Sequence, residues 1–194
     1  MARWTADGDS FRFRAGRPSL DLCSTLLWRH REPVEQLRDP ADLARWLCAA
    51  GLCGDGARAT PEQLASARAL REAGYRLFGR HLAGRAPDAA DIAVVNATAA
   101  HPDRFPQLTP SGGVRWSAGE PVAAALATVA RDCIDVLTGP LADRLRECAA
   151  PDCAFLFVDT SRPGTRRWCA QNRCGNRQHV RDHRARRSPE GDGP

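Results

Sequence analysis

Residues 148–174 read CAAPDCAFLFVDTSRPGTRRWCAQNRC, and this stretch decides the fold of the C-terminal part of the chain. It holds two pairs of cysteines: four residues separate the members of each pair, and fifteen separate the pairs. Zinc binds four thiolates in a tetrahedron, at about 2.3 Å from each sulfur. Two short chelating loops joined by a turn can supply those ligands. We therefore predict one structural zinc ion, with no open coordination position, bound by Cys148, Cys153, Cys169 and Cys174.

The chain between and after the cysteine pairs favours a hairpin followed by a helix. An apolar run at 155–158 predicts a strand, turn-forming residues fill 159–164, and 165–168 would return toward the metal as a second strand. No proline follows Cys174 until Pro189, so we expect a helix to begin near the second chelating loop. A zinc knuckle, a hairpin and a helix in this order predict a treble-clef-like zinc finger.

Positive charge is concentrated in the same part of the chain. The whole protein has a formal net charge of +5, whereas residues 148–187 contain nine Arg and three Asp, a formal +6. On a helix, Arg177, Arg181 and Arg184 would share one face, from which guanidinium groups could reach the phosphates and base edges of double-stranded DNA. Alternatively these arginines form a solvated face of an Arg-rich protein. Zinc with four thiolates also carries a formal −2, which offsets part of their charge. The residues expected to contact DNA are Arg162, Arg166, Arg167, Arg173, Asn176, Arg177, Arg181 and Arg184.

The remaining four cysteines do not predict a second zinc site. Cys48 and Cys53 repeat the spacing of the pairs above, and Cys23 with Cys133 could complete a set of four ligands. However, Cys23, Cys48 and Cys133 lie on apolar helical stripes, where a free cysteine behaves as a small hydrophobic residue. We therefore expect one zinc ion per chain.

Residues 1–147 predict a mainly helical domain, because apolar residues recur at helical spacing between recognisable caps. The clearest start is TPEQ at 60–63, which matches a capping box, and Asp39 and Asp88 mark two further starts. Turn residues between Phe105 and Trp116 predict a small β-hairpin. Helices are expected at 19–30, at 39–51, from 60, from 88, at 120–139, and in a short segment ending near 147.

Apolar stripes on these helices predict which side chains form the core. On the helix from 60 we expect a buried face of Leu64, Ala67, Leu70, Leu77 and Phe78, with Arg68, Arg71, Glu72 and Arg76 mostly outside. On the later helices the expected stripes are Ile92, Val95 and Ala99, and then Leu126, Val129, Ala130, Cys133, Ile134 and Leu137.

Length and composition are typical of a globular protein. At 194 residues the chain can form one ordinary domain and one small addition, and no apolar run reaches the roughly 18 residues of a membrane span. The first residues lack the apolar segment of a secretory signal, so we expect a cytoplasmic location and mostly reduced or metal-bound cysteines. The expected parts are a helical domain at 1–147, a zinc finger at 148–187 and a disordered tail at 188–194.

Two stretches resemble known families. The string WCAQNRCGNR at 168–177, with the cysteines upstream of it, is similar to the signature of the bacterial CGNR zinc finger family. The preceding part resembles the ABATE domain that is usually found with that finger: LDLCSTL at 20–26 stands where the family tends to have LDFvNT, with Ser24 in place of the usual Asn. The resemblance implies a stress-induced transcription regulator with zinc-dependent DNA binding at its C-terminus.

We therefore expect a zinc-dependent DNA-binding transcription regulator. The finger would contact DNA, and the helical domain would sense a ligand or dimerise. Because a single finger reads few base pairs, a homodimer on two half-sites is expected. The alternative is a protein-interaction module that docks an acidic partner through Arg167 and Trp168.

Four polar residues lie on otherwise apolar helices of the first domain. Asp21, Thr25, Arg71 and Asn96 could line a pocket for a small effector, or they could provide caps and internal hydrogen bonds. The sequence contains no Ser/His/Asp order, phosphate-binding glycine loop or HExxH motif, so we do not expect an enzyme.

Overall fold

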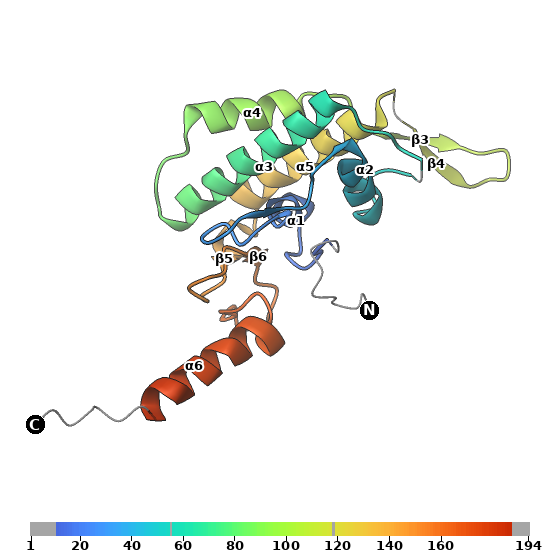
Figure 1. Cartoon of the computed structure of the whole chain (residues 1–194). Coiled ribbons are helices and arrows are strands. Elements are labelled where there is room, and N and C mark those ends of the chain that lie inside the picture. The colour runs from blue at the N-terminus through green and yellow to red at the C-terminus, as the bar shows by residue number, and fades with distance from the viewer. Residues whose placement is uncertain (1–10, 55, 118, 188–194) are drawn as a thin grey trace, which may run out of the picture.

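The structure is a computed structural model of the protein, and it describes residues 11–54, 56–117 and 119–187. Within these residues helices dominate, and the strands form two-stranded antiparallel sheets, as the expected mainly α class requires (Figure 1). The helices are α1 (Pro18–Cys23), α2 (Pro40–Ala49), α3 (Pro61–Leu82), α4 (Ala89–Ala99), α5 (Pro121–Thr138) and α6 (Asn176–Arg187), with a 3-10 turn at Ala142–Arg144 and a π turn at Gln171–Gly175. The strands are β1 (Leu26–Leu27), β2 (Val34–Glu35), β3 (Phe105–Leu108), β4 (Val114–Ser117), β5 (Leu145–Glu147) and β6 (Leu156–Val158).

Capping residues start three helices where the sequence predicts. At the start of α3 the Thr60 hydroxyl accepts a hydrogen bond from the Gln63 N–H at 3.2 Å, and the Gln63 side chain accepts one from the Thr60 N–H at 3.0 Å. The Asp39 carboxylate accepts the Asp42 N–H at 2.8 Å at the start of α2, and the Asp88 side chain caps α4. Each cap satisfies a backbone donor that the first helical turn leaves unpaired. These three predicted starts are confirmed.

The helices α3, α4 and α5 lie side by side as a layer, with α1 and α2 packed against α3 and α5 (Figure 1). The predicted apolar face of α3 is buried, as are the first four residues of the predicted α5 stripe. This burial of apolar surface is the main force that holds the layer together. None of the described helices is long and apolar enough to cross a membrane.

The predicted hairpin between Phe105 and Trp116 is present as β3 and β4. The strands pair in antiparallel register, and the Thr109 hydroxyl accepts the Gly113 N–H at 2.9 Å within the turn. The hairpin projects from the helical layer (Figure 1). It therefore contributes little to the core, and Leu108 at its end is 81% exposed.

The expected helix at 19–30 is wrong beyond Cys23. The hydroxyls of Ser24 and Thr25 donate to backbone carbonyls three residues earlier, at 2.8 and 2.7 Å. Such local bonds compete with helical ones. The chain then turns, and Leu26–Leu27 pairs with β2 instead of continuing the helix.

The finger hairpin uses a different strand from the one expected. β6 pairs with β5, so that Leu145 lies opposite Val158, and the hairpin encloses the first chelating loop. The expected second strand at 165–168 is absent, although this segment returns to the metal centre, where the Arg167 carbonyl accepts the Ala149 N–H at 2.9 Å. The expected short helix is the 3-10 turn Ala142–Arg144, which ends before 147 because residues 145–147 form β5. The observed hairpin therefore spans the predicted domain boundary between 147 and 148.

The finger hairpin and the helices share one hydrophobic core. Phe157 of β6 is fully buried in the same cluster as the helical core residues. The adjacent Val158 donates its N–H to the Ala15 carbonyl at 2.9 Å, which joins β6 to the N-terminal segment. The position of the finger is thus fixed by apolar packing as well as by chain connectivity.

Arg71 of α3 is buried, which corrects the expectation that it lies mostly outside. It is 4% exposed and donates to both carboxylate oxygens of Glu35 at 2.7 Å, and to Glu72 at 2.7 Å. The Thr25 hydroxyl accepts a further bond from Arg71 at 3.2 Å. Burial raises the pKa of Glu35, but the hydrogen bonds from Arg71 outweigh it and lower the pKa overall. Arg71 therefore ties α3 to β2.

Replacing Arg71 with Met should lower the free energy of unfolding by about 2 kcal/mol, because the partly buried Glu35 would lose both of its hydrogen bonds from Arg71, whereas Glu72 would keep its ion pair with Arg29. Urea denaturation measures the change. The matched control is Arg58→Met at an exposed position, which should cost less than about 0.5 kcal/mol. Equal stability of the two variants would contradict the role given to Arg71.

Candidate metal centre and nucleic-acid surface

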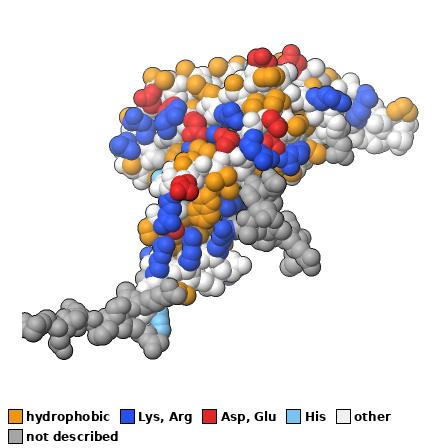
Figure 2. All heavy atoms as spheres, viewed as in Figure 1, with side chains coloured by type: hydrophobic (Ala, Val, Ile, Leu, Met, Phe, Trp, Pro, Cys, Tyr) orange, Lys and Arg blue, Asp and Glu red, His pale blue; other side chains and the backbone are white. Residues whose placement is uncertain are grey.

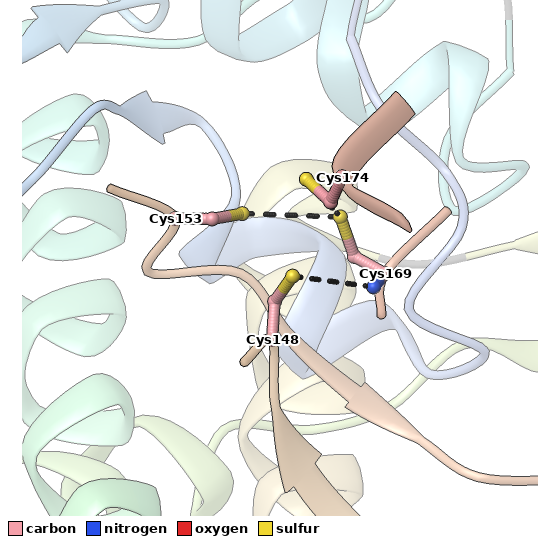
Figure 3. Close-up of side chains that lie close together, drawn as sticks. All are labelled: Cys148, Cys153, Cys169 and Cys174. Atoms are coloured by element: carbon pink, nitrogen blue, oxygen red, sulfur yellow. Dashed lines mark hydrogen bonds between the residues drawn. The ribbon is translucent and has the colours of Figure 1, made fainter. Parts of the chain in front are cut away.

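The four predicted zinc ligands converge in space (Figure 3). Their sulfur atoms all lie within 4.8 Å of one another. The Sγ atoms of Cys153 and Cys169 are 3.8 Å apart, and those of Cys169 and Cys174 are 3.5 Å apart. In a tetrahedron with metal–sulfur bonds of about 2.3 Å, neighbouring sulfurs lie about 3.8 Å apart. The predicted ligand set therefore fits one zinc ion and is confirmed.

Local backbone structure positions the cysteines. Cys148 directly follows β5, and Cys153 ends the first chelating loop, where its N–H donates to the Ala150 carbonyl at 2.9 Å. Cys174 lies in the π turn, and its N–H donates to the Ala170 carbonyl at 3.0 Å. The wide turn places the last ligand beside the other three and leads directly into α6.

Hydrogen bonds to the sulfur atoms favour thiolates. The Cys169 N–H donates to the Cys148 sulfur at 3.4 Å, and the Arg177 guanidinium donates to the Cys174 sulfur at 3.7 Å. The hydrogen bond with Cys148 raises the pKa of Cys153 to about 12, so neighbouring thiols do not ionise together on their own. A divalent cation removes this repulsion, and four sulfur ligands leave no coordination position for a substrate. The metal would therefore hold the finger together.

Asp152, in the first chelating loop, holds α6 in place. It is 6% exposed, and its carboxylate lies 3.3 Å from the Arg181 guanidinium and 3.5 Å from that of Arg177. Arg31, between β1 and β2, lies 3.6 Å from the same oxygen. Burial raises the pKa of Asp152, but the charges of Arg177 and Arg181 outweigh it and lower the pKa overall. Two arginines that the sequence assigned to DNA therefore also position the helix.

The other residues assigned to DNA differ in exposure. Arg166 is partly buried, lies 4.3 Å from the centre of the Phe157 ring and donates to the Trp168 carbonyl at 2.9 Å, so it stabilises the finger. The side chain of Arg184 lies outside the described residues. The exposed members of the predicted set are Arg162, Arg167, Asn176 and Arg181.

A cationic group between the N-terminal segment and the finger was missed from the sequence. We name it the seam cluster, and it consists of Arg12, Arg14, Trp28, Arg166 and Arg173. The guanidinium groups of Arg12 and Arg173 each lie 5.7 Å from the centre of the Trp28 ring. Arg14, Arg166 and Arg173 line a cavity of about 530 Å³ beside the metal centre. Figure 2 shows basic side chains gathered between the helical body and α6.

The seam cluster brings like charges together. Burial and the charges of Arg173 and Arg14 lower the pKa of Arg12 to about 10. None of the described residues that line the cavity is acidic. Arg166 and Arg173 were expected at the DNA interface, but no sequence pattern predicts their grouping with Arg12 and Arg14, which are far away in the chain and share no motif with them. A surface of this kind attracts anions.

The four residues predicted to line an effector pocket are not brought together. The Asp21 carboxylate accepts two backbone N–H groups of the N-terminal segment, both at 2.9 Å. Thr25 and Arg71 contact each other in the core, whereas Asn96 is exposed on α4. The first three residues therefore provide internal hydrogen bonds, which is the alternative that the sequence left open.

Two family models match the chain. The ABATE model, described as "Putative stress-induced transcription regulator", matches residues 16–140. The CGNR zinc finger model matches residues 144–187, which include β5 and all four metal ligands. No curated protein matches the chain.

Replacing Asp21 with Asn should stabilise the protein above neutral pH. Burial raises the pKa of Asp21 from 3.8 to about 6, so between about pH 4 and 6 the folded protein holds a proton that the unfolded chain has lost. This residue therefore makes stability fall as pH rises through that range. The Asn variant keeps the oxygen that accepts both N–H groups and loses the buried charge.

Urea denaturation at two pH values tests this expectation for Asp21. The Asn variant should be more stable than the wild type by on the order of 1 to 2 kcal/mol at pH 8, and nearly equal at pH 4. If the Asn variant is less stable than the wild type at pH 8, the ionised Asp21 carboxylate stabilises the folded protein and the expectation is wrong.

Replacing Cys169 with Ser should release the metal and loosen the finger, because the free energy of zinc binding is also free energy of folding. In hydrogen exchange, amides at 145–176 should lose protection, whereas those of α3 should keep it. The control is Cys48→Ser, which lies outside the cluster and should keep one zinc ion per chain in elemental analysis. A Cys169→Ser protein with one tightly bound zinc ion and a fully protected finger would rule out the assigned ligand set.

Proposed function

Because the chain belongs to the ABATE family and ends in a CGNR zinc finger, we propose that it is a zinc-dependent DNA-binding transcription regulator. The family description supports the regulatory role, and the converging cysteines support the metal. The seam cluster, which lies beside the metal centre, carries the proposal of DNA as the partner. Its position makes the metal necessary for the proposed DNA-binding surface, since the finger supplies two of the four arginines of the cluster.

A polyanion is the partner that the charge of the seam cluster favours. Close guanidinium groups repel one another, and phosphates would relieve that repulsion and release counterions. Zinc with four thiolates contributes a formal −2 nearby, which offsets part of the positive charge. Arg162 and Arg167 add two exposed positive charges to the finger. The arginines of the N-terminal segment and of the finger thus carry more positive charge than is needed to offset the formal −2 of the metal centre.

The contacts of Asp152 divide the finger arginines into two roles. We assign phosphate contact to Arg162, Arg167 and Arg173, because the first two are exposed and the third belongs to the seam cluster. Arg177 and Arg181 are primarily positioning residues, since both contact a buried carboxylate. We also propose that two copies bind together, because a single finger covers few base pairs.

A protein-interaction module is the second candidate function. The guanidinium of Arg167 lies 5.1 Å from the centre of the Trp168 ring, next to a cavity of about 450 Å³ that both residues line. Arg and Trp side chains are favoured at the centres of protein interfaces. An acidic partner docked there would be held by apolar contact as well as charge, so its binding would persist in high salt.

Mobility shifts with genomic DNA fragments test the proposed function. The zinc-loaded protein should bind with an affinity that falls as salt rises, and Arg162→Gln with Arg173→Gln should lower the slope of log affinity against log salt by about 2. The matched control, Arg58→Gln, should bind as the wild type does. Zinc content, measured for each variant, separates loss of charge from loss of the finger.

Two results would contradict the DNA proposal. One is the absence of any salt-dependent shift by the zinc-loaded wild type. The other is a double variant, Arg162→Gln with Arg173→Gln, that binds DNA with wild-type affinity and slope. Retention of a protein partner at high salt, lost in Trp168→Ala, would favour the second candidate function.

A further inference from the structure

Another cavity is lined by residues of α3, α4 and α5 and by the connection between α3 and α4. Figure 1 shows that connection at one end of the helical layer. The volume of the cavity is about 340 Å³, within the range of small-molecule sites. Three helices line it, and it lies outside the finger and the seam cluster. Its apolar wall consists of Leu77 from α3, Ile92 and Val95 from α4, and Ile134 and Leu137 from α5.

The apolar wall is incompletely packed. The sequence predicts core positions for Ile92, Ile134 and Leu137, but Ile92 is 37% exposed and the other two are only partly buried. Protein interiors normally close such gaps, and an unfilled apolar cavity lowers stability. The three helices therefore present apolar surface that the described part of the chain does not cover.

Among the described residues that line this cavity, the polar groups include a positive charge and no negative charge. His81, Arg85, Asn96 and Thr138 lie among the lining residues, and no acidic residue is among those described there. Asp88, in the adjacent loop, lies 3.7 Å from Arg80, which partly neutralises its charge. His81 and Thr138 already bond backbone carbonyls, whereas Arg85 is exposed at the end of the cavity. The cavity therefore combines an apolar wall with one permanent positive charge.

We propose that this cavity binds a small amphipathic monoanion, with an aliphatic chain against the apolar wall and a carboxylate at Arg85. Charge complementarity selects the anion, and a charged hydrogen bond to a guanidinium is stronger than a neutral one. Such a ligand would be the effector of the transcription regulator proposed above, so its biological role rests on that proposed function. The site differs from the four residues that the sequence suggested for a pocket, sharing only Asn96.

Isothermal titration calorimetry on the full zinc-loaded chain tests the site without DNA, so its result is independent of the DNA proposal. The probes are octanoate, 1-octanol and octylamine, which share a chain length and differ in charge. Octanoate should bind with one site per chain, at least about tenfold more tightly than octylamine. Arg85→Gln should weaken octanoate about tenfold and leave 1-octanol nearly unchanged.

A second variant fills the cavity. Ile92→Trp places a larger side chain at a partly exposed wall position, so the protein should still fold, which thermal melting checks. It should abolish octanoate binding, whereas Arg58→Gln should leave it intact. The proposal is overturned if octanoate does not bind, if octylamine binds equally well, or if Arg85→Gln binds octanoate as the wild type does. Loss of a wild-type dimer in Ile92→Trp, without octanoate binding by either protein, would assign the cavity to self-association instead.

Discussion

The mutual repulsion of four closely spaced cysteine sulfurs, balanced by one divalent cation, is the constraint on which the C-terminal part of the protein depends. The sulfurs lie within 4.8 Å of one another, so they can be thiolates together only around a metal. Besides the metal, the short β5–β6 hairpin, with three residues on each side, and the hydrogen bond from the Ala149 N–H to the Arg167 carbonyl at 2.9 Å hold the two chelating loops together. α6 is a twelve-residue helix with few apolar side chains, and an isolated helix of that length is marginal in water. The metal centre and Asp152 together determine where it lies.

The finger shares its hydrophobic core with the helical part, and this shared packing brings the arginines of the seam cluster together. β6 packs into the common core and bonds the N-terminal segment at Ala15, just after Arg12 and Arg14. The same segment is held by Asp21, whose buried carboxylate accepts two of its N–H groups. The seam cluster therefore forms only when the metal centre and the helical core are both in place. The surface proposed to bind DNA would therefore be lost whenever either part is disturbed.

Features that depend on local chemistry were predictable from the sequence, and features that depend on distant partners were not. The caps at Asp39 and Thr60, the β3–β4 hairpin and the cysteine spacing involve neighbouring residues, and each was found where expected. β5 was missed because its pairing with β6 depends on how the first chelating loop folds back. Arg71 was misplaced because its partner Glu35 is 36 residues away. The seam cluster and the Asp152 contacts likewise join segments that are separated in the chain and share no repeating sequence pattern.

X-ray absorption spectroscopy at the zinc edge, on protein purified without added metal, measures which atoms bind the ion and at what distance. We expect one zinc ion per chain, with four sulfur neighbours at about 2.3 Å and no nitrogen or oxygen ligand. A site with fewer sulfur neighbours, or metal-free protein whose finger is equally well protected from hydrogen exchange, would contradict this expectation.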